Sequence, residues 1–188
     1  MRIVWLIICL VAVALAGLFL AIYRRASRPA LNRQLPDVRI VIIKSKRQLM
    51  LYSDNRLLRT YDVGLGFNPI PDKAREGDGA TPEGEFYVFT KNEQSAYYLS
   101  LGISYPNIED AERGLRDELI TEEQYGQIVS AIQSRRTPPQ NTALGGLIYI
   151  HGHGSKKDWT LGCVALDDNN MKELFEAIPV GAKVIIEH

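Results

Sequence analysis

Cys163 and His151 are the two side chains in this sequence whose types and spacing suggest covalent chemistry. Cys163 is the only cysteine outside the N-terminal apolar segment, and His151 stands twelve positions before it. A cysteine thiol has an ordinary pKa of about 8.5, so only a few per cent of it is nucleophilic thiolate at neutral pH. An imidazole can accept the thiol proton and later return it to a leaving amine. The pair therefore predicts nucleophilic acyl transfer.

Gly162, immediately before the cysteine, adds to this prediction. A residue without a side chain lets a substrate carbonyl approach the backbone closely, and the N–H groups of Gly162 and Cys163 could form part of an oxyanion hole. The alternative is structural, because free cysteines are among the most deeply buried residues. From these residues alone, a buried core cysteine remains an open interpretation of Cys163.

Two histidines spaced as His-x-His raise the alternative of a metal site. With further ligands they could form a tetrahedral centre. The candidate ligands are His151 and His153, with Cys163, Asp158 or His188 to complete the set. The glycine after each histidine disrupts the strand that would hold them, and no paired-cysteine motif is present. We therefore expect no metal and no cofactor, and we expect His153 to lie in the groove beside the nucleophile.

The order of residues around these positions resembles the L,D-transpeptidase catalytic domain, also called the YkuD fold. The shared pattern is Ile-His-Gly, a variable loop, and then Thr-x-Gly-Cys-Val-x-Leu. The resemblance implies that Cys163 is the nucleophile, His151 the general base and Gly162 the glycine of the catalytic motif. It also implies that the backbone carbonyl of Gly152 orients the histidine. Thr160 falls on the family's Ser/Thr position and is expected to contact the substrate.

The resemblance continues upstream and covers nearly all of residues 38 to 187. Its further motifs are Lys73, Gly77-Asp78, Thr81-Pro82-Glu83-Gly84, Ser104-Tyr105-Pro106-Asn107 and Pro138-Pro139-Gln140. It implies that the loop around Lys73 borders the substrate groove, with the lysine contacting a substrate carboxylate. The alternative is a solvated lysine on a plain connection. Tyr98 is expected to offer its ring and hydroxyl to the substrate.

Two departures from the family pattern leave the acyl acceptor open. Ala165 stands where the commonest form has an arginine, and the loop between the histidine and the cysteine is short. Branches of the family without that arginine include peptidoglycan–lipoprotein amidases. The expected substrate is the peptidoglycan stem peptide. The acyl group could pass to an amine, including attachment of a cell-wall-linked lipoprotein, or to water, as in an L,D-carboxypeptidase or amidase. A catalytically inactive wall-binding module is a further alternative.

An apolar segment precedes this domain. Residues 3–23 contain no charged residue, and about 20 such residues span a bilayer as a helix. Residues 1–23 are therefore predicted to be one transmembrane helix or an uncleaved signal, and residues 24–36 a linker to a catalytic domain at 37–188. The rival is a cleavable signal peptide, since Ala14-Leu15-Ala16 has the form of a cleavage site.

The distribution of charged residues bears on the location of the protein and on its partners. Four arginines follow the apolar segment and one precedes it, which by itself would keep the domain in the cytoplasm. The substrate implied by the resemblance lies outside the inner membrane, so we expect a single-pass inner-membrane protein with a periplasmic domain. The 22 basic and 22 acidic side chains balance, and nothing in the totals suggests nucleic acid.

The elements that would position these residues are mostly strands. Apolar and alternating patterns predict the strands, and helical periodicity predicts two inserted helices and a later third one. The predicted strands are 38–44, 48–52, 57–63, 86–90, 95–101, 147–150 and 183–187, and the predicted helices are 109–115, 122–132 and 169–178. The fold class is mainly β with helical insertions (α+β), and the resemblance implies a β-sandwich or barrel. The inserted helices, the second capped by Thr121, would form a lid or cleft wall, or would simply pack on the sheet.

Overall fold

The computed structural model describes residues 17, 31 and 35–188. The predicted transmembrane segment and nearly all of the predicted linker lie outside these residues and stay predictions. Within the described part of the chain, no helix is long and apolar enough to cross a bilayer.

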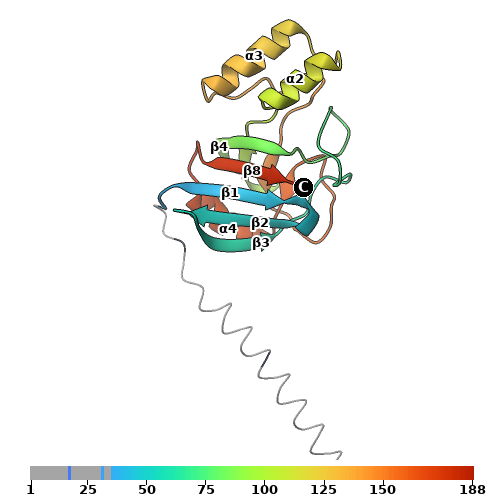
Figure 1. Ribbon diagram of the computed structural model, residues 1–188. Helices are drawn as coiled ribbons and strands as arrows, with labels where there is room; N and C mark the ends of the chain where they lie inside the picture. The colour runs from blue at the N-terminus through green and yellow to red at the C-terminus, as the bar shows by residue number, and fades with distance from the viewer. Residues whose placement is uncertain (1–16, 18–30, 32–34) are drawn as a thin grey trace, which may run out of the picture. The chain divides into compact units, whose positions relative to one another are not determined.

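Eight strands form one sheet in the order β3-β2-β1-β8-β4-β5-β6-β7 (Figure 1). The strands are β1 (Val38–Ile43), β2 (Gln48–Ser53), β3 (Arg56–Asp62), β4 (Gly84–Ser95), β5 (Tyr98–Ile103), β6 (Tyr149–His151), β7 (Val164–Ala165) and β8 (Lys183–Glu187). Neighbouring strands are antiparallel except for the pairs β1–β8 and β6–β7. The strand that comes latest in the sequence therefore lies in the middle of the sheet.

Alternating apolar residues explain why these segments pair in this register. The buried positions are Val38, Ile40 and Ile42 in β1, Leu49 and Leu51 in β2, and Val184 and Ile186 in β8. Because side chains alternate between the two faces of a strand, and because Ile40 lies opposite both Leu51 and Val184, these residues share one face. That face forms the core.

The two edges of the sheet meet beside the catalytic motif. Gly64, just after β3, exchanges two backbone hydrogen bonds of 2.9 and 2.8 Å with Ala165 in β7. The carbonyl of Leu65 accepts hydrogen bonds from the N–H groups of Trp159 and Thr160. These contacts curl the sheet into a partly closed barrel and confirm the mainly β prediction with helical insertions.

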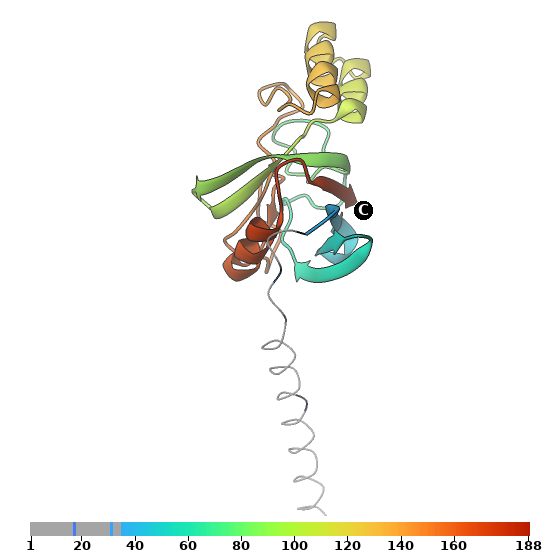
Figure 2. The same cartoon turned by 90° about the vertical axis from the view of Figure 1, so that its left-hand side faces the viewer.

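Three α-helices complete the domain: α2 (Ile108–Arg116), α3 (Glu122–Gln133) and α4 (Asp168–Ala177). Capping boxes start the first two, at Asn107 and at Thr121, as predicted for the second. α2 and α3 stand together beyond the β4 side of the sheet (Figures 1 and 2) and share a small apolar cluster. Its buried members are Ala111, Ile120, Ile128 and Leu144.

One element prediction was wrong. Residues 95–101 do not form one strand, because β4 ends at Ser95 and β5 starts at Tyr98, with a tight turn between them. The Ser95 hydroxyl accepts a hydrogen bond from the Tyr97 N–H, and Tyr98 adopts a φ of 73°. The hairpin lacks the glycine or proline that normally marks a turn in sequence.

Candidate active site

Cys163 and His151 line one cavity of about 400 Å³. The wall comes from the end of β6, from the hairpin turn between β4 and β5, and from three loops, at residues 73–77, 145–148 and 159–163. Its residues are Lys73, Glu76, Gly77, Tyr97, Gly145, Gly146, Leu147, Ile148, His151, Trp159, Thr160, Leu161 and Cys163. Neither α2 nor α3 supplies a residue, so the inserted helices do not form a lid over this cavity.

His151 ends strand β6 and is buried. Its Nδ1 lies 2.8 Å from the carbonyl oxygen of Gly152, the contact that the family resemblance implies. Since a carbonyl can only accept, Nδ1 carries the proton and Nε2 is left with a free lone pair. Burial lowers the pKa of His151, and the nearby His153 acts in the same direction. The imidazole is thus neutral and oriented as a base at neutral pH.

Cys163 is half-buried, just before β7. Its Sγ accepts a hydrogen bond from the Tyr149 N–H at 3.4 Å and donates one to the Leu147 carbonyl at 3.5 Å. Burial raises the pKa of the Cys163 thiol, whereas the Tyr149 N–H and the charge of Lys73 act to lower it. The resting site therefore holds a neutral thiol and a neutral imidazole, and the proton leaves the sulfur as attack occurs.

Thr160 shapes the nucleophile loop from inside the protein. The side chain is buried, and its hydroxyl donates to the Cys163 carbonyl at 2.7 Å and accepts from the Gly162 N–H at 3.1 Å. The Gly162 N–H is therefore already bonded to Thr160, which leaves its predicted place in an oxyanion hole without support. Thr160 holds the turn that presents the cysteine; it also lines the cavity, and its predicted contact with substrate stays a prediction.

Gly162 is required at its position for two steric reasons. Its φ of 130° lies in the region that favours glycine, and a Cβ there would stand 2.7 Å from the carbonyl oxygen of Ala80. The loop before β4 thus supports the nucleophile loop from behind.

Tyr97, rather than the predicted Tyr98, lies at the cavity. The Tyr97 ring is 4.7 Å from the His151 ring at an interplanar angle of 32°, and Trp159 meets the same imidazole edge-on at 5.6 Å. Tyr98 is not among the residues that line the cavity. Neither Tyr97 nor Trp159 was predicted to be a site residue. The position of the turn alone decides which of the two neighbouring tyrosines faces the histidine.

His153 opens onto a neighbouring cavity, which also has Tyr97 and Trp159 in its wall. The structure does not assemble the alternative metal site. Asp158 forms an ion pair with Arg47, and His188 lies beside Glu83. Among residues 17, 31 and 35–188, no group of three His, Cys, Asp or Glu side chains could hold a metal ion.

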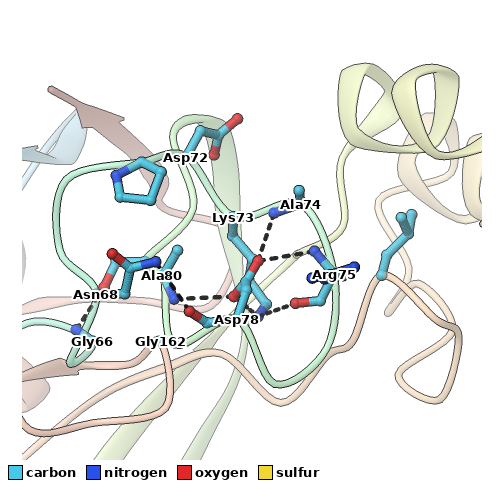
Figure 3. Close-up of polar contacts among 12 residues, drawn as sticks. Gly66, Asn68, Asp72, Lys73, Ala74, Arg75, Asp78, Ala80 and Gly162 are labelled. Carbon is cyan, nitrogen blue, oxygen red and sulfur yellow. Dashed lines mark hydrogen bonds and ion pairs between the residues drawn. The ribbon is translucent and has the colours of Figure 1, made fainter. Parts of the chain in front are cut away.

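Lys73 is not the exposed lysine of the alternative interpretation. Its side chain is 3% exposed, and its Nζ lies 2.9 Å from a carboxylate oxygen of Asp78 and 3.0 Å from the Arg75 carbonyl. Figure 3 shows the Asp78 carboxylate at the centre of this loop, where it also accepts the N–H groups of Ala74, Arg75 and Ala80. Burial alone would raise the pKa of Asp78, but these donors hold it below its usual value.

Residues 37–186 match the family model of the L,D-transpeptidase catalytic domain, YkuD. The chain belongs to this family. A search among curated proteins gave no match.

Solved structures share the fold of this L,D-transpeptidase domain. One is the helical cell shape determining protein Pgp2 from Campylobacter jejuni, with 23% identity and a TM-score of 0.53 over 87% of this chain and 53% of that one. Another is Bd1075 from Bdellovibrio bacteriovorus, with 19% identity and a TM-score of 0.51 over 84% of this chain and 50% of that one. The chain thus spans about half the length of these two proteins.

Ala165, the departure from the commonest family pattern, has a structural counterpart. The residue is fully buried in β7, where it pairs with Gly64 across the seam of the barrel. This complete burial fits a small side chain at this position in this L,D-transpeptidase domain.

Proposed function

We propose that this protein is an L,D-transpeptidase-like cysteine acyltransferase acting on peptidoglycan stem peptides. The observation that carries the proposal is the presence, in one cavity, of the Cys163 thiol and of an imidazole oriented by the Gly152 carbonyl. Family membership supports a peptidoglycan-modifying role in general. The cavity needs no metal for acyl transfer through a thioester.

The first half-reaction follows from the residues at the cavity. Cys163 Sγ bonds to the carbonyl carbon that precedes a terminal D-residue, and its proton passes to His151 Nε2. The tetrahedral intermediate collapses to a thioester as the C–N bond breaks. His151 gives the proton to the departing amine, so the D-amino acid leaves and the base is restored.

The second half-reaction depends on the acceptor. An amine of another stem peptide gives a crosslink, an amine of a cell-wall-linked lipoprotein gives attachment, and water gives hydrolysis. In each case the acceptor attacks the thioester carbonyl carbon as His151 removes its proton, the C–S bond breaks, and the proton returns to the Cys163 sulfur. The observation that keeps the hydrolase alternative is Ala165, at the position where the commonest form of the family has an arginine.

The proposed location is the inner membrane, with residues 1–23 as a single-pass anchor and the catalytic domain in the periplasm. The apolar run and the extracytoplasmic substrate support this proposal. Alkaline phosphatase fused after residue 188 should be active in cells. Inactive fusions, with full activity of a cytoplasmic reporter at the same point, would instead place the domain in the cytoplasm.

Incubation with defined muropeptides, read by mass spectrometry, tests the function. Wild-type protein should release a terminal D-amino acid and form a crosslinked or hydrolysed product through a covalent adduct on Cys163. Cys163→Ala should abolish turnover while circular dichroism stays unchanged, and His151→Ala should strongly slow adduct formation. Cys9→Ser serves as the matched control and should retain full activity. Turnover by the Cys163→Ala variant would refute the proposal.

A further inference from the structure

Lys73 is the only lysine or arginine among the described residues that line the catalytic cavity. Its side chain is almost fully buried, in a wall made mostly of glycines, aromatic rings and apolar side chains, with Thr160 and Cys163 as uncharged polar groups and Glu76 as the one carboxylate. A charge in such a setting is screened far less than one at the surface, so it acts strongly on other charges in the same cavity.

The hydrogen bonds of Lys73 leave one of its donors unused. Two of its three N–H groups are bonded, to Asp78 and to the Arg75 carbonyl, and its Nζ also lies 5.9 Å from the centre of the Tyr105 ring. No third oxygen or nitrogen acceptor is found among residues 17, 31 and 35–188. Lys44, the other fully buried lysine, provides the contrast. Its three N–H groups are all bonded, to Pro71, Thr81 and Glu83. All three N–H donors of Lys44 are thus used in structural hydrogen bonds, whereas Lys73, in the cavity wall, has one N–H without an oxygen or nitrogen acceptor among the described residues.

The ammonium of Lys73 is held firmly. Asp78 fixes its head, while the Lys73 carbonyl accepts a hydrogen bond of 2.6 Å from Arg113 of helix α2. The aliphatic stem passes Gly145, where an added Cβ would lie 3.4 Å from Lys73 Cε. Figure 3 shows the lysine reaching from its loop back toward Asp78. A charge fixed in advance stabilises a reaction without reorganisation when negative charge develops.

The catalytic centre needs such a group. Negative charge develops on sulfur during attack and then on the carbonyl oxygen of the tetrahedral intermediate. The Gly162 N–H, an obvious donor for that oxygen, is bonded to Thr160. We propose that Lys73, held by Asp78, is the cation that stabilises the Cys163 thiolate and the oxyanion. This inference rests on the proposed function and assigns Lys73 an electrostatic role distinct from binding a substrate carboxylate.

The direction in which Lys73 shifts the pKa of the thiol agrees with this assignment. The charge of Lys73 acts to lower the pKa of Cys163 against the larger opposing effect of burial. The other titratable side chains in the cavity wall are His151, Glu76 and Tyr97, and Tyr149 also interacts with the charge of Cys163. Asp78 and Tyr105 lie against Lys73.

Alkylation of the thiol tests the inference without any substrate. The full chain with Cys9→Ser has Cys163 as its sole thiol, and iodoacetamide modification is followed from pH 5 to pH 10. Lys73→Met should move the thiol titration upward by about 0.5–1 pH unit, and slow alkylation at pH 7 by about 3- to 10-fold. Lys172→Met, which removes an exposed lysine on α4, should leave the profile unchanged.

A charged reagent adds a second readout. Iodoacetate carries a carboxylate and iodoacetamide does not, so a cation beside the sulfur raises the ratio of their rates. Lys73→Met should lower that ratio, and Lys172→Met should not. Because Lys73→Met leaves a buried carboxylate unpaired, the pair Lys73→Met/Asp78→Asn serves if the single variant fails to fold.

An unchanged titration and rate ratio in a folded variant without Lys73 would overturn the inference, even if the wild type turns over muropeptides. A shift in both, with no muropeptide turnover, would support the cation and refute the proposed substrate. The two proposals therefore fail separately.

Discussion

At the scale of single residues, the catalytic pair rests uncharged. Burial raises the thiol pKa and lowers the imidazole pKa, so both changes oppose a thiolate–imidazolium pair. Many cysteine enzymes instead keep a preformed thiolate beside a charged histidine. In this site the base must act during attack, so the rate should depend on His151 being neutral.

The pH dependence of acylation follows from this state. A lowered imidazole pKa means that the neutral base survives into more acidic solution. The acid limb of kcat/KM for muropeptide acylation should therefore fall below 6.5, the ordinary histidine value. Initial rates from pH 4.5 to pH 9 check this, and an acid limb above 6.5 would contradict it.

Thr160 offers a test of how the nucleophile is presented. Thr160→Val keeps the shape but leaves the Gly162 N–H and the Cys163 carbonyl without their shared partner. An unpaired buried polar group costs about 1–3 kcal/mol. We expect kcat/KM to fall by about 10-fold or more, with a lower melting temperature. Thr160→Ser retains the hydroxyl and should stay near wild type; equal loss in both variants would argue against the hydrogen bonds.

The sequence predicted the residues at this scale whose chemistry is intrinsic to their type. A lone thiol, a histidine and a glycine are recognisable from their order, and the Gly152 carbonyl follows from its adjacency to the histidine. The hydrogen bond that already occupies the Gly162 N–H could not be predicted, because it depends on which rotamer Thr160 adopts. The same holds for Lys73, whose burial depends on a carboxylate five positions away.

At the scale of elements, the β4–β5 hairpin covers the base. Its turn places the Tyr97 ring on His151, and the Tyr97 carbonyl accepts the Gly152 N–H at 3.0 Å. The hairpin therefore holds both the imidazole and the residue that orients it. A shift of this turn by one residue would exchange the two tyrosines, so the position of the turn decides that Tyr97 and not Tyr98 contacts His151.

Removing the Tyr97 ring should change the titration of His151. Tyr97→Ala exposes the imidazole, so its pKa should rise toward the ordinary value and the acid limb of kcat/KM should move to higher pH. Tyr97→Phe keeps the ring and should keep the wild-type limb. Tyr98→Ala is the matched control, since that ring does not line the cavity. An unmoved limb in Tyr97→Ala would show that the hairpin does not shield the base.

Hydrophobic periodicity and helix caps predicted most of the strands and helices, whereas a turn without glycine or proline was not predicted. The Thr121 cap and the helix that follows it were confirmed, because both signals are local. The prediction of a single strand at 95–101 was wrong, because the strand-like residue pattern continues across the turn that Ser95 stabilises. The closure of the barrel could not be predicted from local sequence patterns either, because it joins Gly64 to a residue about a hundred positions later.

At the scale of the whole molecule, Arg113 ties the helical insertion to the barrel. Its guanidinium bonds to Asp72 at 2.7 Å and to the Lys73 carbonyl, on the loop before β4, and to Asp110 at 2.8 Å within α2. Burial raises the pKa of Asp110 to about 7, against the opposing effects of the Asn107 N–H and Arg113. This junction therefore titrates near neutral pH.

The free energy of unfolding should report that titration. Between the ordinary aspartate pKa of 3.8 and about 7, native Asp110 holds a proton that the unfolded chain lacks. Its contribution to stability is therefore full below the unfolded pKa and is lost as pH rises through the folded one, by at most about 1.4 kcal/mol per unit. Urea unfolding of wild type minus Asp110→Asn, at pH 4.5, 6 and 7.5, should show a decreasing difference. A difference that increases with pH would contradict it.

The central place of β8 has a consequence for how the domain folds. Residues 183–187 join β1 to β4, so without this segment the other strands would form two separate halves. The pairing of β8 with both halves therefore helps to bring the Gly64 side of the seam against the segment that carries the nucleophile. The catalytic cavity is thus completed by a strand that contributes no residue to its wall.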